Sequence, residues 1–214
     1  MMTLASQPLP RAQIEDLRRA ELVAATLRVV SAQGFDRATV RDIAKAAHAS
    51  VGSVNYYFKS KDDLLRTAIA ETDRQFRIRV REAVSETPGH ADKLARVIEL
   101  CFPILDEQQG PDWGVFVDFW YQASRHESYR AIFSEAHLEW IEMLSQVLED
   151  GVSAGTFRLT APAHDEAVRF ASMIDGLAVY TRVTDHVDFE TARRILKEHI
   201  AGLSADTSNS VRKR

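Results

Sequence analysis

Apolar residues recur along most of the chain at intervals of three or four positions, which is the period of an amphipathic helix. Val23, Leu27 and Val30 begin this pattern, and similar repeats continue almost to the C-terminus. Runs that alternate apolar and polar residues, as a half-buried strand requires, do not occur. The segment TFRLTAP at 156–162 reads at most as an extended loop. The pattern therefore predicts an all-α protein.

Local signals indicate where the predicted helices begin and end. Thr39 and Asp42 form a capping box before a short repeat, and Ser60 and Asp63 form another before a long one. Proline and glycine residues separate the later repeats. Beyond the first 60 residues, the expected helices span 61–86, 91–108, 112–124, 127–154, 163–185 and 189–203.

Two short helices that follow a longer one predict a helix-turn-helix unit near the N-terminus. The first short helix starts after Thr39, and the residues His48, Ala49 and Ser50 separate it from the second. We therefore expect a three-helix head on a larger helical body. The expected boundaries are 1–15 for a disordered N-terminal arm, 16–61 for the helix-turn-helix domain, 62–203 for the body and 204–214 for a disordered basic tail.

The composition fits a cytoplasmic DNA-binding protein once the charge is divided between the two parts. The net charge is −4, but residues 1–61 carry nine Lys/Arg and five Asp/Glu, so the remainder holds the negative excess. A basic head could approach an anionic polymer. No apolar run reaches the roughly 20 residues of a membrane span, no secretory signal opens the chain, and the single cysteine, Cys101, excludes an internal disulfide.

The segment SVGSVNYYFKSK at 50–61 is the candidate reading helix. Val54 and Phe58 point the same way and are expected to face the head's core, which leaves the intervening side chains exposed. Asn55 can both donate to and accept from a base edge, and tyrosine hydroxyls can bind phosphates. The alternative is an ordinary capped surface hairpin whose tyrosines only pack.

The run TVRDIAKAAHASVGSVNYYFKSKDDLL at 39–65 closely resembles the DNA-binding head of the TetR family of bacterial transcription regulators. The resemblance implies phosphate contacts from some of these residues and base-edge contacts from others. His48 stands where the family usually has glycine, and Asn55 where an aromatic is commoner. The expected DNA-binding residues are Thr39, Arg41, Ser50, Val51, Gly52, Ser53, Asn55, Tyr56, Tyr57 and Lys61.

Family members usually bind a small molecule in the body, and this body has a suitable aromatic segment at 113–140. It holds all three tryptophans, with Asp118, Glu135 and Glu139 nearby, so it could hold a cation against its ring faces. Packing as core filler is the alternative. The expected ligand-binding residues are Phe102, Trp113, Phe116, Trp120, Phe133, His137, Trp140, Met173 and Tyr180.

The C-terminal segment 173–203 resembles the ligand domain of the choline-responsive repressors of betaine synthesis, through IDG at 174–176 and the following DFE-ARRIL pattern. We do not extend that resemblance to the ligand. The helices near 163–185 and 189–203 are expected to form a homodimer, with Gly176 allowing close approach; an intramolecular contact is the alternative. The proposed interface stripe comprises Val168, Ala171, Ile174/Asp175, Ala178 and Arg182.

No motif indicates an enzyme, a metal or a cofactor. HExxH, GxSxG and glycine-rich phosphate loops do not occur, and Cys101 on an apolar helix reads as an inert buried thiol. The sequence thus predicts a homodimeric repressor that a small effector releases from a palindromic DNA operator. The alternatives are a ligand- or protein-binding module that does not read DNA, and a DNA binder without a ligand. The effector, operator, target genes and sign of regulation stay open.

Overall fold

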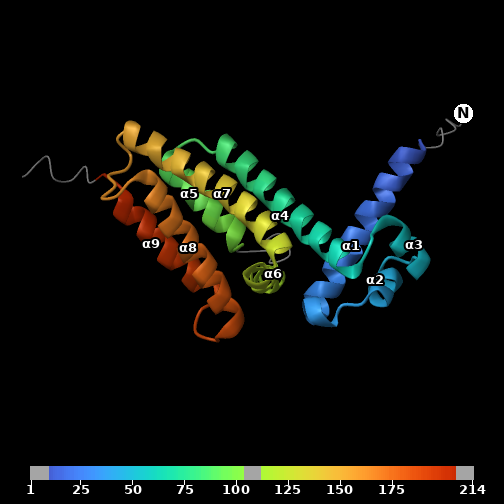
Figure 1. The fold of residues 1–214 in the computed structure, drawn as a ribbon. Coiled ribbons are helices and arrows are strands. Elements are labelled where there is room, and N and C mark those ends of the chain that lie inside the picture. The colour runs from blue at the N-terminus through green and yellow to red at the C-terminus, as the bar shows by residue number, and fades with distance from the viewer. Residues whose placement is uncertain (1–9, 104–111, 206–214) are drawn as a thin grey trace, which may run out of the picture. The chain divides into compact units, whose positions relative to one another are not determined.

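The computed structural model describes residues 10–103 and 112–205, and within them it confirms the all-α prediction. The only strand-like pairing in those residues is an isolated antiparallel bridge between Phe157 and Ser204. Figure 1 shows the described helices, which are α1 (Arg11–Arg37), α2 (Val40–Ala46), α3 (Val51–Tyr57), α4 (Lys61–Glu86), α5 (His90–Cys101), α6 (Trp113–Arg125), α7 (Glu127–Ser153), α8 (Ala163–Val183) and α9 (Phe189–Leu203).

The chain divides into two compact units, residues 1–71 and 72–214. The first unit, the head, packs α2 and α3 and the start of α4 against α1. The helical backbone of α1 is interrupted near its end at Gly34, which adopts a positive φ of 80°. The head's core consists of Leu22, Val23, Ala25, Ile43, Ala44, Val54, Phe58, Leu64 and Ala68.

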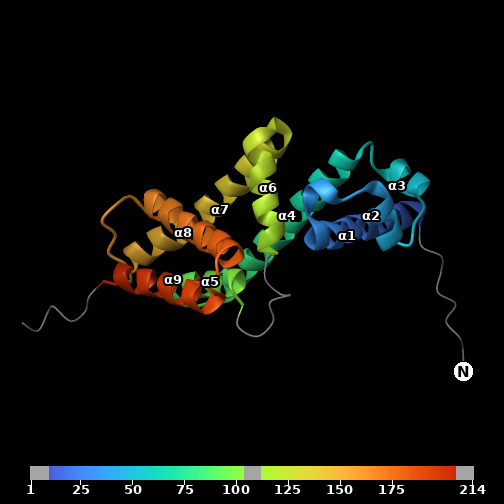
Figure 2. The same cartoon turned by 90° about the horizontal axis from the view of Figure 1, so that it is seen from below.

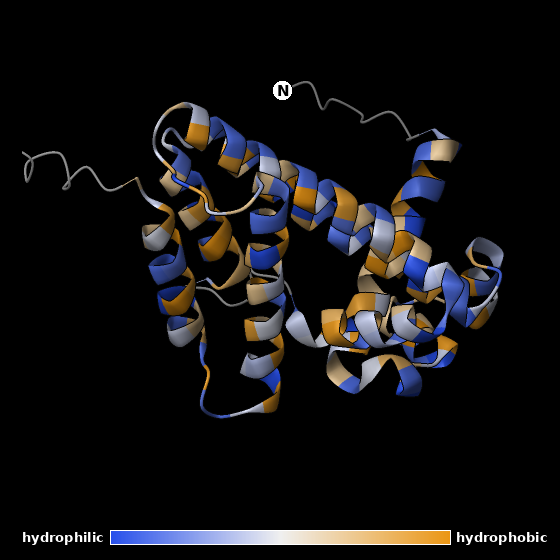
Figure 3. Ribbon diagram, turned by 60° about the vertical axis from the view of Figure 1, so that its left-hand side comes forward, coloured by the Kyte–Doolittle hydropathy of each residue, from blue (hydrophilic) through white to orange (hydrophobic). Residues whose placement is uncertain are grey.

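The second unit, the body, is a bundle in which α7 packs against α5, α6 and α8, and α9 packs against α5 and α8. Figures 1 and 2 both show α8 and α9 side by side. Hydrophobic and hydrophilic residues alternate around each helix (Figure 3), as an amphipathic helix requires. The largest fully buried side chains of this core include Phe102, Leu94, Ile98, Leu144, Leu148, Phe170, Ile174 and Leu196.

Several boundaries differ from the prediction. α1 begins at Arg11, so residues 11–15 are helical rather than part of a disordered arm. The units meet at 71/72 instead of 61/62. α5 ends at Cys101, not at 108, and the end of the predicted helix lies outside the described residues. Ser204 and Ala205, expected in the tail, instead pair with the segment around Phe157.

No helix within residues 10–103 and 112–205 combines the length and the apolar character that a transmembrane span demands.

Candidate DNA-contact surface and ligand pocket

Both short helices of the head begin with side-chain caps. The Thr39 hydroxyl accepts a hydrogen bond from the Asp42 backbone N–H at 3.2 Å, and the Ser50 hydroxyl accepts one from the Ser53 N–H at 3.0 Å. Hydrogen bonding to Thr39, more than any other cause, lowers the pKa of Asp42. These bonds fix the first turns of α2 and α3. Thr39, Arg41 and Ser50 all remain exposed at these helix starts.

The turn between α2 and α3 depends on His48, whose φ is 51°. This is the left-handed region, which non-glycine residues seldom adopt, and histidine tolerates it better than most. The turn's N–H groups return to α2, with Ala49 N–H donating to the Ala44 carbonyl at 2.9 Å and His48 N–H donating to that of Lys45 at 3.2 Å. The turn therefore has a left-handed residue at the position where the family usually has glycine.

The candidate reading helix α3 has the buried and the exposed side that its sequence predicts. Val54 and Phe58 are 1% and 2% exposed, so they belong to the head's core. Tyr56 is 68% exposed, and its ring meets the edge of Tyr57 at a centroid distance of 5.0 Å. Val51, Gly52 and Asn55 are exposed, and Ser53 and Tyr57 are half-buried. Small, flat and hydroxyl-bearing side chains thus form the outer surface of α3.

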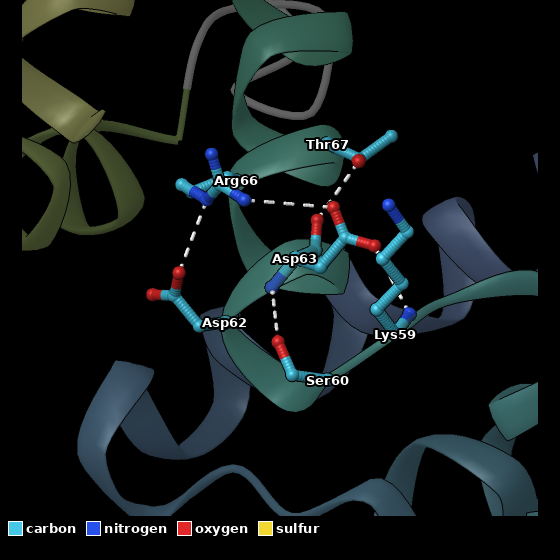
Figure 4. A network of polar contacts seen from close by, with 6 residues as sticks. All are labelled: Lys59, Ser60, Asp62, Asp63, Arg66 and Thr67. Carbon is cyan, nitrogen blue, oxygen red and sulfur yellow. Dashed lines mark hydrogen bonds and ion pairs between the residues drawn. The ribbon is translucent and has the colours of Figure 1, made fainter.

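The start of α4 is a polar network, drawn in Figure 4. Ser60 Oγ accepts from the Asp63 N–H at 3.1 Å, which is one half of the predicted capping box. The Asp63 carboxylate accepts from the N–H of Lys59, the residue before the cap, at 3.1 Å. Arg66 binds the carboxylates of Asp62 and Asp63. This network fixes the first turn of α4, which carries Lys61.

Lys61 is directed toward the end of α1. Its Nζ donates to the backbone carbonyl of Asp36 at 3.2 Å. An ammonium group has three donors, so one such bond leaves two for another acceptor. Contact between Lys61 and a DNA phosphate stays a prediction, as do the contacts expected of the other head residues.

The body contains a pocket with about 560 Å³ of empty space, counting its opening to solvent. Most of its wall is aromatic and comes from α6 and α7, and α4 and α8 close it. Its lining residues are Asp73, Phe76, Arg77, Cys101, Trp113, Phe116, Phe119, Trp120, Phe133, Ala136, His137, Trp140, Ile174 and Asp175.

Asp73 and Arg77 of the pocket wall belong to an ion-pair network that extends beyond the pocket. Arg77 Nε lies 2.8 Å from the Asp73 carboxylate, and Arg77 also pairs with Glu139 of α7. Arg81 joins the same Glu139 carboxylate at 3.3 Å. Burial raises the pKa of Asp73, although its bond to Arg77 acts in the opposite direction. The positive charge of Arg77 is therefore neutralised by two carboxylates within the protein.

Asp175 on α8 is the second carboxylate of the pocket, and its surroundings differ. Among residues 10–103 and 112–205, no side chain forms an ion pair or hydrogen bond with it. Burial raises its pKa to about 7. Burial likewise lowers the pKa of His137, and burial followed by the charge of Asp175 raises that of Cys101. The Cys101 thiol is consequently unreactive. The Asp175 carboxylate, in contrast, has no counter-ion among the described residues.

Six of the nine predicted ligand residues line this pocket, and three do not. Phe102 is buried beneath it and stacks on Trp113 at 5.8 Å, Met173 packs against the core, and Tyr180 is exposed. The nearby carboxylates expected from the sequence, Asp118, Glu135 and Glu139, are not in the wall. The six residues that do line it are Trp113, Phe116, Trp120, Phe133, His137 and Trp140.

The pocket also contains residues that the sequence analysis missed. Asp73, Phe76 and Arg77 come from α4, far from the aromatic segment in sequence. Asp175 was assigned to the dimer stripe, but its side chain lies in the pocket wall. The motif IDG at 174–176, already noted in the resemblance, was the one available signal for it.

The prediction that the apolar stripe on α8 is a free surface for dimer contacts is wrong. Ala171, Ile174 and Ala178 are each 1% exposed or less and belong to the core of the body. A neighbouring face of α8 is open instead, because Gly176 has no atom within 4 Å of a Cβ built on it, and Tyr180 and Val183 are exposed.

Within residues 10–103 and 112–205, no three His, Cys, Asp or Glu side chains are placed to hold a metal ion together.

Family models match both units of the chain. The model of bacterial regulatory proteins of the tetR family matches residues 22–68, and the model of the C-terminal domain of BetI-type transcriptional repressors matches residues 88–205. The chain belongs to the TetR family. Its body is of the BetI type, and as a member of this family the protein is a DNA-binding transcriptional regulator and not an enzyme.

Relatives of this TetR-family chain match over most of their length. It is 30% identical over 176 residues to the HTH-type transcriptional regulator BetI of Agrobacterium fabrum, covering 80% of each chain, and 22% identical to the regulator PksA of Bacillus subtilis, covering 96% of this chain and 99% of that one. A regulator from Saccharomonospora viridis, solved in complex with choline, has the same fold, with a TM-score of 0.81 and 21% identity over 89% of this chain and 99% of that one.

Proposed function

We propose that this regulator is a homodimeric repressor, and that a small organic cation releases it from a palindromic operator in the bacterial cytoplasm. The observation that carries the effector class is the aromatic pocket with Asp175. A carboxylate without a counter-ion, beside tryptophan rings, suits a ligand that brings its own positive charge. The choline found in the Saccharomonospora viridis regulator belongs to this chemical class.

The pocket favours a monovalent cation with a bulky apolar shell. Its wall is mostly rings, whose faces attract positive charge, and an ammonium group that carries methyl substituents loses little hydration on entering such a site. Asp73 is already neutralised by Arg77 at 2.8 Å, so it offers less to the ligand than Asp175 does. An anionic ligand would meet Asp175 unfavourably.

In the head, we assign base reading to the outer side of α3. Asn55 is exposed on that face and carries both a donor and an acceptor, which can pair with an adenine edge. Thr39, Ser53, Tyr56, Tyr57 and Lys61 would contact phosphates, whereas Arg41, Val51, Gly52 and Asn55 would lie near base edges. Ser50 has a supporting role in this assignment, since its hydroxyl caps α3.

Two copies would associate through α8 and α9. The support is the open face at Gly176, which has no neighbouring atom within 4 Å of its Cβ position, flanked by exposed Tyr180 and Val183. A glycine in mid-helix costs about 1 kcal/mol relative to alanine, so close approach of another helix would account for it. Two helices from each copy would make a four-helix interface around a two-fold axis.

Release would follow from the spacing of the two heads. Recognition helices of such a dimer must enter successive major grooves about 34–36 Å apart. A ligand that binds better to a dimer with another spacing shifts the population away from this value. A coupling free energy of about 1–3 kcal/mol would lower the operator affinity roughly 5–150-fold.

The test begins with a selection of random DNA duplexes on the purified protein at about 0.15 M salt. An enriched palindrome supplies the probe, and its affinity is then measured with choline and with dimethylbutanol, the uncharged isostere of choline. We expect choline to weaken binding within the range above and the isostere to have no effect. Equal effects of the two compounds would contradict the cation assignment, and no enriched duplex would contradict operator reading.

A further inference from the structure

The end of α5, beside the ligand pocket, is held by side chains from two other helices. α5 ends at Cys101, and the last carbonyls of a helix lack a partner within that helix. Trp113 of α6 donates from its indole Nε1 to the Cys101 carbonyl at 3.1 Å. Arg193 of α9 donates from Nη1 to the carbonyls of Phe102 and Pro103, at 2.8 and 3.2 Å. An arginine that does not itself line the pocket therefore fixes the backbone next to it.

Two aromatic contacts connect the same place to the pocket wall. The Phe102 ring, which is 0% exposed, stacks on the ring of Trp113 with a centroid distance of 5.8 Å and an interplanar angle of 29°. It also meets the ring of Phe189, the first residue of α9, edge to face at 5.5 Å and 79°. Phe189 and Arg193 are four positions apart, so they share one side of α9. Both residues thus brace Phe102, and Phe102 supports Trp113.

These contacts give a structural role to the DFE-ARRIL pattern noted in the sequence. Its two consecutive arginines have different surroundings. Arg193 is half-buried and bonded to the end of α5, whereas Arg194 is exposed and pairs with Glu198 of the same helix at 3.2 Å. The first arginine of the pair is therefore the one that connects α9 to the pocket wall.

We propose that Arg193 is a positioning residue of the ligand pocket. From α9 it fixes Phe102, and Phe102 in turn sets the ring of Trp113 against the ligand. The orientation of that ring matters because an aromatic ring attracts a cation over its face. This role rests on the proposed function, in which the pocket binds a small organic cation. It also gives α9, one of the two proposed dimer helices, a direct contact with the ligand site.

The experiment measures the dissociation constant of choline for the full chain by calorimetric titration. Arg193→Met keeps an apolar stem and removes the donors, and we expect several-fold weaker binding. Removing a positive charge would by itself favour a cation, so the expected loss has the opposite sign to the electrostatic effect. Arg193→Lys should retain most of the affinity, because Nη1 makes both bonds and an ammonium group can replace one nitrogen.

Two controls separate positioning from charge and from stability. Arg194→Met removes the same charge from the next position of α9 and should leave the affinity unchanged. Gly151→Ala overpacks the body against Phe157, which does not line the pocket, so it should lower the unfolding temperature without weakening choline binding. An equal loss of affinity in Arg193→Met and in either control would overturn the positioning role.

A double-mutant cycle tests whether Arg193 acts through Trp113. In a Trp113→Leu background the ring that Phe102 supports is absent, so Arg193→Met should cost less choline affinity than in the wild type. Equal costs in the two backgrounds would refute the connection through Trp113. Thermal unfolding of each variant verifies that the body remains folded.

The remaining outcomes distinguish the role of Arg193 from the proposed function. If the wild type binds choline and Arg193→Met binds it equally well, the positioning role is refuted and the cation pocket stands. If the wild type does not bind choline, the proposed effector class and the role of Arg193 fail together.

Discussion

At the scale of single residues, Asp175 has surroundings that oppose its own charge. Its pKa of about 7 lies above the ordinary value of 3.8, so the unfolded chain ionises at a lower pH than the folded one. Stability from this group is therefore fully present below pH 3.8 and declines as the pH rises toward 7. A ligand cation would reverse the preference by stabilising the ionised form.

The pH dependence of cation binding tests this reasoning. Choline should select ionised Asp175, so its affinity should rise as the pH increases from 6 to about 8 and then level off. Calorimetric titration should also detect proton release when the experiment is performed near pH 7. A flat profile would mean that Asp175 does not face the ligand.

Substitution of Asp175 should separate binding from stability. Asp175→Asn removes the buried charge, and at about 1.4 kcal/mol per pKa unit the protein should gain stability of the order of a few kcal/mol at pH 8 while losing choline affinity. Asp73→Asn is the matched control, because the bond to Arg77 at 2.8 Å offsets part of the cost of burying Asp73, so this variant should gain less stability than Asp175→Asn. Thermal unfolding and choline titration of both variants provide the measurements.

Asn55 is the residue for which the sequence departs from the commoner aromatic, and it is exposed on α3. Asn55→Ala should relax the base preference at one position in each half-site, because a bidentate amide contact to a base is worth roughly 1–3 kcal/mol of discrimination. Repeating the duplex selection with the variant measures this. An unchanged enriched sequence would remove Asn55 from base reading.

At the scale of helices, local chemistry explains how well the boundaries could be predicted. α6 and α9 begin within a residue of the expected positions, because the side chains of Asp112 and Asp188 accept hydrogen bonds from N–H groups of their first turns. α5 was predicted too long. Pro103 disfavours helical backbone at the residue before it, and Phe102 accordingly has φ −132° and ψ 74°.

Only half of the ligand pocket could be predicted from the sequence, because tertiary packing assembles the rest. The aromatic residues of α6 and α7 are concentrated in one segment, so the sequence identifies them together. Asp73 and Arg77 are spaced by four positions, which reads as an ordinary surface pair on a helix. Only the packed structure shows that both side chains are mostly buried and that they line the same pocket as residues of α6 and α7 and Asp175.

Gly151 shows how tightly α7 is fitted to the segment that follows it. A Cβ at this position would meet the Phe157 ring, with Cε2 at 2.6 Å, and the Cβ of His90 at 3.1 Å. Gly151→Ala should therefore destabilise the protein by roughly 1–3 kcal/mol, the usual cost of overpacking. Chemical denaturation gives the value.

Gly202→Ala in α9 serves as the control for that substitution. Nothing lies within 4 Å of its Cβ position, so alanine should be neutral or stabilising by up to about 1 kcal/mol. A similar loss of stability in both variants would contradict the role of the Phe157 contact.

At the scale of the whole molecule, the open face of α8 should govern assembly. A Cβ at Gly176 has no neighbouring atom within 4 Å, so a side chain can leave the helix here and each copy of Gly176→Arg should fold normally. The bulky charged side chain should prevent close approach of another helix. We expect monomers by light scattering and loss of affinity for a palindromic duplex. Gly176→Ala should remain dimeric, and a dimeric Gly176→Arg protein would place the interface elsewhere.

The net charge of the whole chain does not show how the charge is divided between the N-terminal residues and the rest. The overall value of −4 gives no hint of DNA binding, whereas residues 1–61 alone carry more basic than acidic side chains. The basic excess of residues 1–61 thus lies in the part of the chain that carries the helix-turn-helix unit, where it can attract an anionic polymer.

All three tryptophans of the chain, Trp113, Trp120 and Trp140, lie in the wall of one pocket. Their indole rings dominate the protein's intrinsic emission, so its intensity and wavelength report on a single site. Entry of a compound should change this signal without any label, whereas events at the head should leave it almost unchanged. The protein therefore contains its own optical sensor, and libraries of candidate effectors can be screened on the unmodified chain.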